Sequence, residues 1–162
     1  MNPIHIHLML NHVPVLGAFL ACALLAYALI RDHEPYKKLA YVILAVVGLA
    51  APIVAVSGEK AAEGIESLAV VPDPAVHAHE EAGEGAEIAL VALGILAFLQ
   101  LCSYLFPNLH RLRGRTAPLL LLGAAAAFAW SAYTANLGGK IRHGEELRTG
   151  GAVGGAPAEA GD

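Results

Sequence analysis

Four long stretches without a charged side chain constrain this chain more than any other feature. They begin at Leu8, Leu39, Ile88 and Ala117, in a chain that is 57% hydrophobic and only 15% charged. A helix needs about 20 consecutive apolar residues to cross a bilayer. We therefore expect an all-α integral membrane protein, with membrane-spanning segments over about residues 8–30, 39–57, 87–106 and 117–137.

The basic residues predict how these segments are oriented. The loop after the first segment contains Arg31, Lys37 and Lys38, and the loop after the third contains three arginines. Short loops rich in Lys and Arg stay on the cytoplasmic side. Both termini and the acidic loop 58–87 should then lie outside. Because no basic residue precedes the first apolar segment, we expect a retained helix rather than a signal peptide. Topology accounts for the basic residues, so we expect no nucleic-acid partner.

Proline near a helix-capping residue marks three helix starts. These are Asn2-Pro3, Asp73-Pro74, and Thr116 followed by Pro118. Pro14 predicts a kink in the first helix, because its ring clashes with the carbonyl group four residues earlier. The first helix should thus begin outside the membrane and bend where it enters.

Apolar residues continue at helical spacing after the second segment, through "SGEKAAEGIESL". The first three helices should therefore extend beyond the outer membrane face, with a turn at "AVVPDP". Short loops favour an up-and-down four-helix bundle over residues 1–148. The Gly- and Ala-rich tail 149–162 has no periodic pattern, and we expect it to be disordered. Cys22 and Cys102 lie in apolar segments and have no metal-ligand spacing, so they should be free thiols.

Histidines gather on the outer side in this topology. His33 and His110 fall in the inner loops, where solvated side chains explain them. The other six lie outside: His5, His7, His12, His77, His79 and His143.

In the third helix, two histidines point in opposite directions. At 100° per residue, His77 shares a face with Glu81 and Glu84, which is typical of a solvated surface. His79 lies on the opposite face, which should be packed and which is rich in small residues: Ala75, Ala82, Gly83, Ala86, Leu90, Leu93 and Ala97. His79 is therefore either a hydrogen-bonded core residue or a ligand with space beside it.

The other helices offer further candidates. A stripe along the fourth helix contains Ala125, Ala129, Ala132, Asn136 and His143. The pair Gly138-Gly139 either ends this helix or allows close approach to a partner or a flat ligand, and the sequence leaves both open. In the first helix, His5 and His12 share a face about 10 Å apart, too far for one metal ion. Any site must therefore combine helices, including the acidic face of the second helix: Glu59, Glu63 and Glu66.

Four segments together resemble a known family: "HLMLNHVPVLG", "SGEKAAEGIE", "HEEAGE" and "ANLGGKIRHGE". The family comprises small, uncharacterised bacterial four-helix membrane proteins, related to a membrane domain of unknown function that is sometimes fused to Rieske iron-sulfur domains. Lys60 and Gly144 depart from its pattern, which has Pro at the first position and Pro or Thr at the second. The resemblance implies a bacterial inner membrane protein. The termini, which the basic loops predict to lie outside, would then be periplasmic. It singles out the following residues: His7, Asn11, His12, Pro14, Gly58, Glu59, Ala62, Glu63, His79, Glu80, Asn136, Gly138, Gly139, Arg142 and His143.

Three functional hypotheses follow. The first is a b-type haem protein that exchanges electrons with a redox protein or a larger membrane complex. Its axial ligands would be His12 and His79, with His7 or His143 as substitutes; Asn136 would lie nearby, and Arg142 or Lys140 would meet the propionates. The second is a non-haem site for zinc, iron or copper, built from a mixed set of ligands: His7, His12, His79, His143, Glu59, Glu63 and Glu80.

The third hypothesis is a structural anchor of a larger complex, in which the histidines, with Glu59 and Arg142, form a hydrogen-bonded polar cap. The sequence contains no recognisable nucleophile with its base, phosphate-binding loop or two-carboxylate site. It leaves open whether the protein is an enzyme, and it names no catalytic residue.

Overall fold

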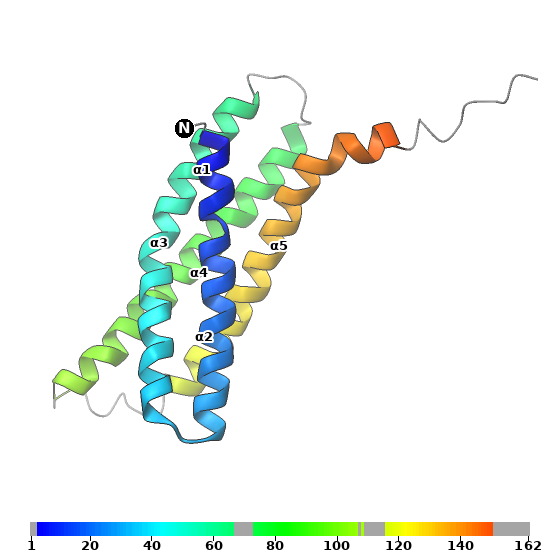
Figure 1. Ribbon diagram of the computed structural model, residues 1–162. Helices are drawn as coiled ribbons and strands as arrows, with labels where there is room; N and C mark the ends of the chain where they lie inside the picture. The colour runs from blue at the N-terminus through cyan, green and yellow to red at the C-terminus, as the bar shows by residue number, and fades with distance from the viewer. Residues whose placement is uncertain (1–2, 67–72, 107, 109–115, 151–162) are drawn as a thin grey trace, which may run out of the picture.

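A computed structural model describes residues 3–66, 73–106, 108 and 116–150. In this part of the chain the regular structure is helical (Figure 1). Four helices are long and apolar enough to cross a membrane when the first two segments are counted together. The all-α prediction is therefore confirmed. The segments are α1 (Pro3–Leu10), α2 (His12–Ile30), α3 (Glu34–Glu66), α4 (Asp73–Leu105) and α5 (Thr116–Gly150).

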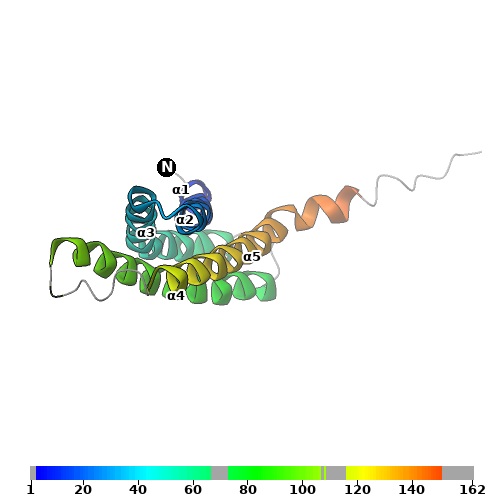
Figure 2. The ribbon, with the colours of Figure 1, turned by 90° about the horizontal axis from the view of Figure 1, so that it is seen from below.

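The helices form an up-and-down bundle. Helix α2 packs against α3, α3 against α4 and α4 against α5, and contacts between α2 and α5 close the ring. Seen along the bundle, α2 and α3 form one layer and α4 and α5 the other (Figure 2). Helix α1 directly precedes α2 in the chain and packs mainly on α3. Short connections thus give the expected antiparallel neighbours.

The break between α1 and α2 lies at Asn11, three residues before Pro14. The Pro14 ring clashes with the carbonyl group of the residue four positions earlier, which is Leu10. The amide of Asn11 still donates a hydrogen bond to the carbonyl oxygen of His7 at 2.9 Å. The regular helix is therefore interrupted at the place that Pro14 predicts, while the chain stays on a helical path.

Small residues line the interior and large apolar residues face outward. The core is rich in alanine, and glycine allows close helix packing: a Cβ on Gly48 of α3 would lie only 2.7 Å from the Cα of Gly94 in α4. Outward-facing Leu49, Ile88 and Leu122 are more than two thirds exposed. Membrane helices associate through small residues in this way, because lipid removes the reason to bury large ones. The pattern is consistent with a lipid environment.

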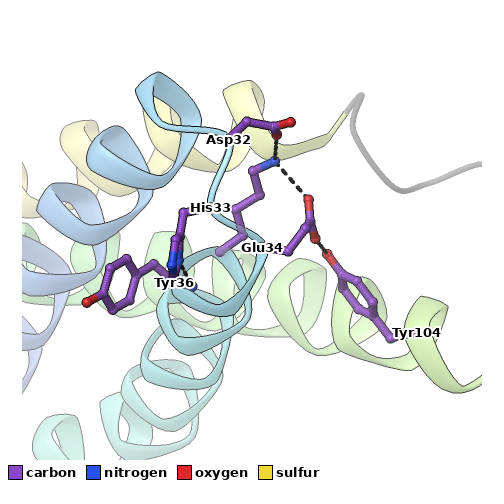
Figure 3. Close-up of polar contacts among 6 residues, drawn as sticks. Asp32, His33, Glu34, Tyr36 and Tyr104 are labelled. Atoms are coloured by element: carbon purple, nitrogen blue, oxygen red, sulfur yellow. Dashed lines mark hydrogen bonds and ion pairs between the residues drawn. The ribbon is translucent and has the colours of Figure 1, made fainter.

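A polar cluster ties α3 to α4 at the end opposite α1 (Figure 3). The Nζ atom of Lys37 donates hydrogen bonds to Asp32 at 2.7 Å and Glu34 at 2.8 Å, and the Tyr104 hydroxyl donates to Glu34 at 2.7 Å. The hydrogen bond from Lys37, and then its charge, hold the pKa of the Asp32 carboxyl below its usual value. Asp32 has a φ of 45°, a turn conformation that Asp and Asn tolerate better than most residues.

The two inner-loop histidines were expected to be solvated. His33 is exposed and stacks on Tyr36, with ring centres 4.3 Å apart. His110 lies outside the described residues. Cys22 and Cys102 are half-buried free thiols, as predicted.

Most predicted helix boundaries agree with the structure. Helix α3 continues to Glu66, α4 starts at Asp73 and runs without interruption, and α5 starts at Thr116. Helix α5 also continues through Gly138 and Gly139, which settles the question of whether the glycine pair ends it. The C-terminal, orange part of α5 turns away from the bundle (Figure 1). The predicted turn at "AVVPDP" falls largely on residues 67–72, and the predicted tail largely on 151–162, both outside the described residues.

The packed face of α4 is confirmed, but that of α5 differs from the prediction. In α4, Ala82, Ala86, Leu90, Leu93 and Ala97 are buried, while Glu81 and Glu84 are exposed. In α5, the stripe containing Ala125, Ala129 and Asn136 is exposed. The buried residues are instead Ala117, Leu120, Ala124, Ala127 and Ser131. Small residues occur on every side of α5, so its sequence could not show which side would pack.

Candidate functional site: a histidine pair at one end of the bundle

His7 of α1 and His79 of α4 face one another across the end of the bundle. Their ring centres are 6.2 Å apart and their ring planes differ by 81°. Both side chains are half-buried. Two residues that are 72 positions apart in the chain are thus adjacent, because antiparallel packing brings the start of α1 beside the start of α4.

The protein fixes the protonation pattern of His7. Its Nδ1 atom lies 3.0 Å from the hydroxyl oxygen of Ser57 in α3. This hydroxyl donates its own hydrogen to the carbonyl oxygen of Val54 at 2.7 Å. The Ser57 oxygen must therefore accept from the Nδ1–H group of His7, which leaves a lone pair on Nε2 of the neutral ring.

His79 is held in the same way by a different helix. Its Nδ1 atom lies 3.0 Å from the backbone carbonyl oxygen of Thr134 in α5. A carbonyl oxygen can only accept, so Nδ1 donates and Nε2 of the neutral ring has the free lone pair. In the described part of the chain, neither Nε2 atom has a hydrogen-bond partner. In their neutral forms the two rings would each present Nε2 with its lone pair free.

A hydrogen-bonded network positions the Thr134 carbonyl group. The hydroxyl of Thr134 bonds to the carbonyl oxygens of Ala82 at 3.2 Å and Trp130 at 3.1 Å. The indole Nε1 of Trp130 donates to the same Ala82 oxygen at 3.0 Å. These contacts join α5 to α4 one turn beyond His79, so they fix the oxygen that orients its ring.

Two glycines make room for the two rings. A Cβ on Gly58 would lie 3.1 Å from Cε1 of His7, and a Cβ on Gly138 would lie 3.0 Å from Cε1 of His79. Both distances are shorter than ordinary van der Waals contact. A Cβ on Gly139 would meet no atom within 4 Å. Each imidazole therefore rests directly on the backbone of a helix that does not carry it.

The other candidate residues are not brought to this pair. His12, the preferred first-helix ligand on the sequence, is exposed, and its Nδ1 contacts the carbonyl oxygen of Leu8 in the same helical path at 2.8 Å. Asn136, Glu59 and Glu63 are also exposed. His12 and Asn136 lie on outward faces because the packing of α2 and α5 buries other sides of these helices.

The remaining candidate residues are Glu80 and three residues near the end of α5. Glu80 lies 3.7 Å from Nδ1 of His77, on the solvated side of α4. Lys140 is exposed. Arg142 and His143 belong to α5, but their side chains lie outside the described part of the structure. Among the described residues, no three His, Cys, Asp or Glu side chains are grouped closely enough to hold a metal ion.

Sequence reasoning missed the residues that orient the pair, Ser57 and Thr134. Ser57 directly precedes Gly58, and Thr134 lies about one helical turn before Gly138. Ser and Thr commonly form hydrogen bonds between membrane helices. A search for hydroxyl residues beside the glycines would have found both side chains, although not the use of the Thr134 carbonyl group.

The fold and the site together define an apolar four-helix bundle with a preorganised pair of histidines at one end. Comparison of the chain with protein-family models, with curated proteins and with solved structures gives no match.

Proposed function

We propose that this protein is a membrane-embedded b-type haem protein that transfers electrons, with His7 and His79 as the axial ligands. The observation that supports it best is the paired geometry of the two rings. The proposal keeps His79 from the sequence-based hypothesis and replaces His12 by His7, since His12 points away from the bundle.

The separation of the rings favours ligation from opposite sides of one metal ion. With metal–nitrogen distances of about 2.0 Å, opposed imidazoles have ring centres about 6.3 Å apart, while imidazoles at a tetrahedral angle have centres about 5.1 Å apart. The observed 6.2 Å is compatible with the opposed arrangement and also with a direct edge contact between the two rings. Axial haem ligands are opposed, whereas zinc ligands in proteins are almost always tetrahedral.

The hydrogen bonds support the same proposal. A histidine that binds a metal usually donates its other ring N–H to a carboxylate, a backbone carbonyl or water, which fixes its orientation. His79 donates to the carbonyl oxygen of Thr134, and His7 donates to the hydroxyl of Ser57. Gly58 and Gly138 set the position of each ring against a helix backbone. The residues present therefore supply two imidazoles that are oriented in advance and that would hold a haem.

A haem with two histidine ligands has no open coordination position, so it would supply one-electron transfer rather than oxygen binding. Ser57 and the carbonyl group of Thr134 would keep both rings in place during that transfer. The electron partner would be a redox protein or a larger membrane complex that reaches the α1 end of the bundle. We place this end outside the bacterial inner membrane, from the distribution of basic loop residues.

Absorption spectroscopy of the purified protein tests the proposal. After expression with adequate haem supply, we expect an intense Soret band and the sharp reduced bands of six-coordinate low-spin haem. His7→Ala and His79→Ala should each lose this low-spin spectrum. His12→Ala and His77→Ala remove exposed histidines, and they should leave it unchanged.

The nearly perpendicular rings predict a second signature. When the planes of two axial imidazoles cross at a large angle, two iron d orbitals remain almost equal in energy, and the ferric electron paramagnetic resonance signal is highly anisotropic. The 81° angle between His7 and His79 should give that signal rather than the rhombic one of parallel rings.

Three results would contradict the proposal. A colourless protein that also fails to take up added haemin would exclude haem. A colourless protein with stoichiometric zinc, iron or copper would favour the metal site instead, with His143 or a carboxylate completing the ligands. Absence of both haem and metal would leave the histidine pair as a structural contact in an anchor protein.

A further inference from the structure

A groove beside the histidine pair has no role in the proposed function. It runs between α1 and α3, with a volume of about 260 Å³. Seven residues line the groove, and five of them are apolar. The lining residues are Pro3, Ile6, Leu10, Ile53, Val56, Ser57 and Lys60. The groove is therefore apolar except for one hydroxyl and one ammonium group.

The charged group of the groove lies apart from the innermost apolar residues. Ile53 and Lys60 are seven residues apart in α3, which corresponds to about 10 Å along a helix. Leu10 and Ile53 lie toward the middle of the bundle, while Lys60 lies toward its outer end. The groove thus presents an apolar floor and then a single positive charge, in the order that a lipid chain and its headgroup would meet them.

Lys60 is available for an external anion. It is exposed, and the described part of the chain contains no ion pair that involves its Nζ atom. Its acidic neighbours Glu59 and Glu63 are exposed and do not line the groove. A single lysine near the membrane surface attracts the phosphate group of an anionic lipid.

Helix α1 needs a contact of this kind. None of its residues is buried, and it packs mainly on α3. A molecule in the groove would touch α1 through Pro3, Ile6 and Leu10 and would touch α3 on the other side. It would therefore add apolar contacts to those that α1 already makes with α3.

We propose that the groove between α1 and α3 binds an anionic phospholipid, with an acyl chain along the apolar floor and the phosphate group at Lys60, and that this lipid holds α1 against α3. Ser57 lines the groove and also accepts the hydrogen bond from His7. The lipid would thereby stabilise the position of His7. Only this last consequence rests on the proposed haem function; lipid binding itself does not.

Native mass spectrometry of the full chain tests the lipid site, whether or not haem is present. The protein would be exchanged into micelles that contain either phosphatidylglycerol or phosphatidylcholine with the same acyl chains. We expect selective retention of phosphatidylglycerol. Lys60→Gln should reduce that preference about fivefold, as expected for one Lys near a phosphate surface. Lys38→Gln, which makes the same charge change at the opposite end, should not reduce it.

A second variant tests the groove rather than the charge. Ile6→Trp should fill the groove and lower retention of both lipids. Leu16→Trp places the same side chain at an exposed position outside the groove and serves as its control. Circular dichroism would establish that each variant folds. Hydrogen exchange of Pro3–Leu10 should also slow when phosphatidylglycerol replaces phosphatidylcholine.

The proposal would be wrong if wild-type protein retained the two lipids equally, or if Lys60→Gln kept the wild-type preference. Undiminished retention by folded Ile6→Trp would also overturn it, because the lipid would then bind elsewhere. None of these results depends on a Soret band, so they are distinguishable from a failure of the haem proposal.

Discussion

Gly138 and Gly139 are neighbours in α5, but only Gly138 touches the histidine pair. A Cβ at position 138 would crowd the His79 ring at 3.0 Å, whereas a Cβ at position 139 would meet nothing within 4 Å. Replacing glycine by alanine in a helix otherwise stabilises it by about 1 kcal/mol. The two positions therefore separate the effect on helix stability from the effect on the site.

Gly138→Ala should displace the His79 ring and weaken or abolish low-spin haem binding. Gly139→Ala should keep the wild-type spectrum and raise stability by up to about 1 kcal/mol. Gly58→Ala should act on His7 as Gly138→Ala acts on His79, with a Cβ at 3.1 Å from the ring. Absorption spectra and thermal unfolding in detergent measure both effects. Equal haem retention by Gly138→Ala and Gly139→Ala would contradict the assigned geometry.

Asp32 gives a prediction about pH. Its folded-state pKa is lowered by Lys37, so the ion pair stabilises the protein above the ordinary Asp pKa of about 4. This contribution is lost as pH falls through the lowered pKa. Asp32→Asn keeps a residue that tolerates the positive φ but removes the charge. We expect a small loss of thermal stability at pH 7 that disappears in strong acid; a difference that persists there would point to the backbone instead.

At the scale of helices, the backbones of α3 and α4 approach each other closely. A Cβ on Gly48 would lie 2.7 Å from the Cα of Gly94 and 2.8 Å from the carbonyl oxygen of Leu90. These are backbone atoms, so they cannot rotate away as a side chain could. The crossing of α3 and α4 thus requires glycine, and it lies between the two polar ends of the bundle.

Gly48→Ala should destabilise the protein by about 1–3 kcal/mol, the usual cost of overpacking. Gly64→Ala in the same helix is the matched control, because its Cβ would lie 3.9 Å from Ile4 in ordinary contact. Unfolding of both variants in mixed micelles measures the difference. If Gly48→Ala were as stable as Gly64→Ala, the close crossing would not be required.

At the scale of the whole molecule, the two ends of the bundle differ in chemistry. The polar cluster around Lys37, which includes Asp32, Glu34 and Tyr104, lies at one end, and the histidine pair lies at the other. By the positive-inside rule, the basic loops predict that the first end lies in the cytoplasm. Orientation therefore decides which compartment the proposed electron partner must occupy.

Cysteine labelling in intact bacterial cells tests this orientation. In a background with Cys22 and Cys102 replaced by Ser, Glu84→Cys should react with a membrane-impermeant maleimide added outside. His33→Cys should react only after the cells are opened. Both positions are exposed in the folded protein, so burial would not explain a difference. The reverse pattern would place the histidine pair in the cytoplasm.

The sequence by itself determined the helices, their approximate ends and the packed face of α4. Uncharged runs, capping residues before proline and helical periodicity are local signals, because each depends on residues within a few helical turns of one another. They also singled out His79 as the inward histidine of its helix. Pro14 predicted the bend of the first helix for the same reason, since its ring acts on a carbonyl group four residues away.

Only the tertiary structure decided which histidine meets His79 and how both are held. The sequence favoured His12 over His7, and alanines on every side of α5 conceal its packed face. Contacts between helices resolve both questions: α1 lies on α3, so His7 reaches Ser57 and Gly58, and α5 offers His79 the carbonyl group of Thr134. The sequence does not show which backbone carbonyl group a histidine will meet, or which glycine will lie beside its ring. Their effect depends on which helix passes beside them.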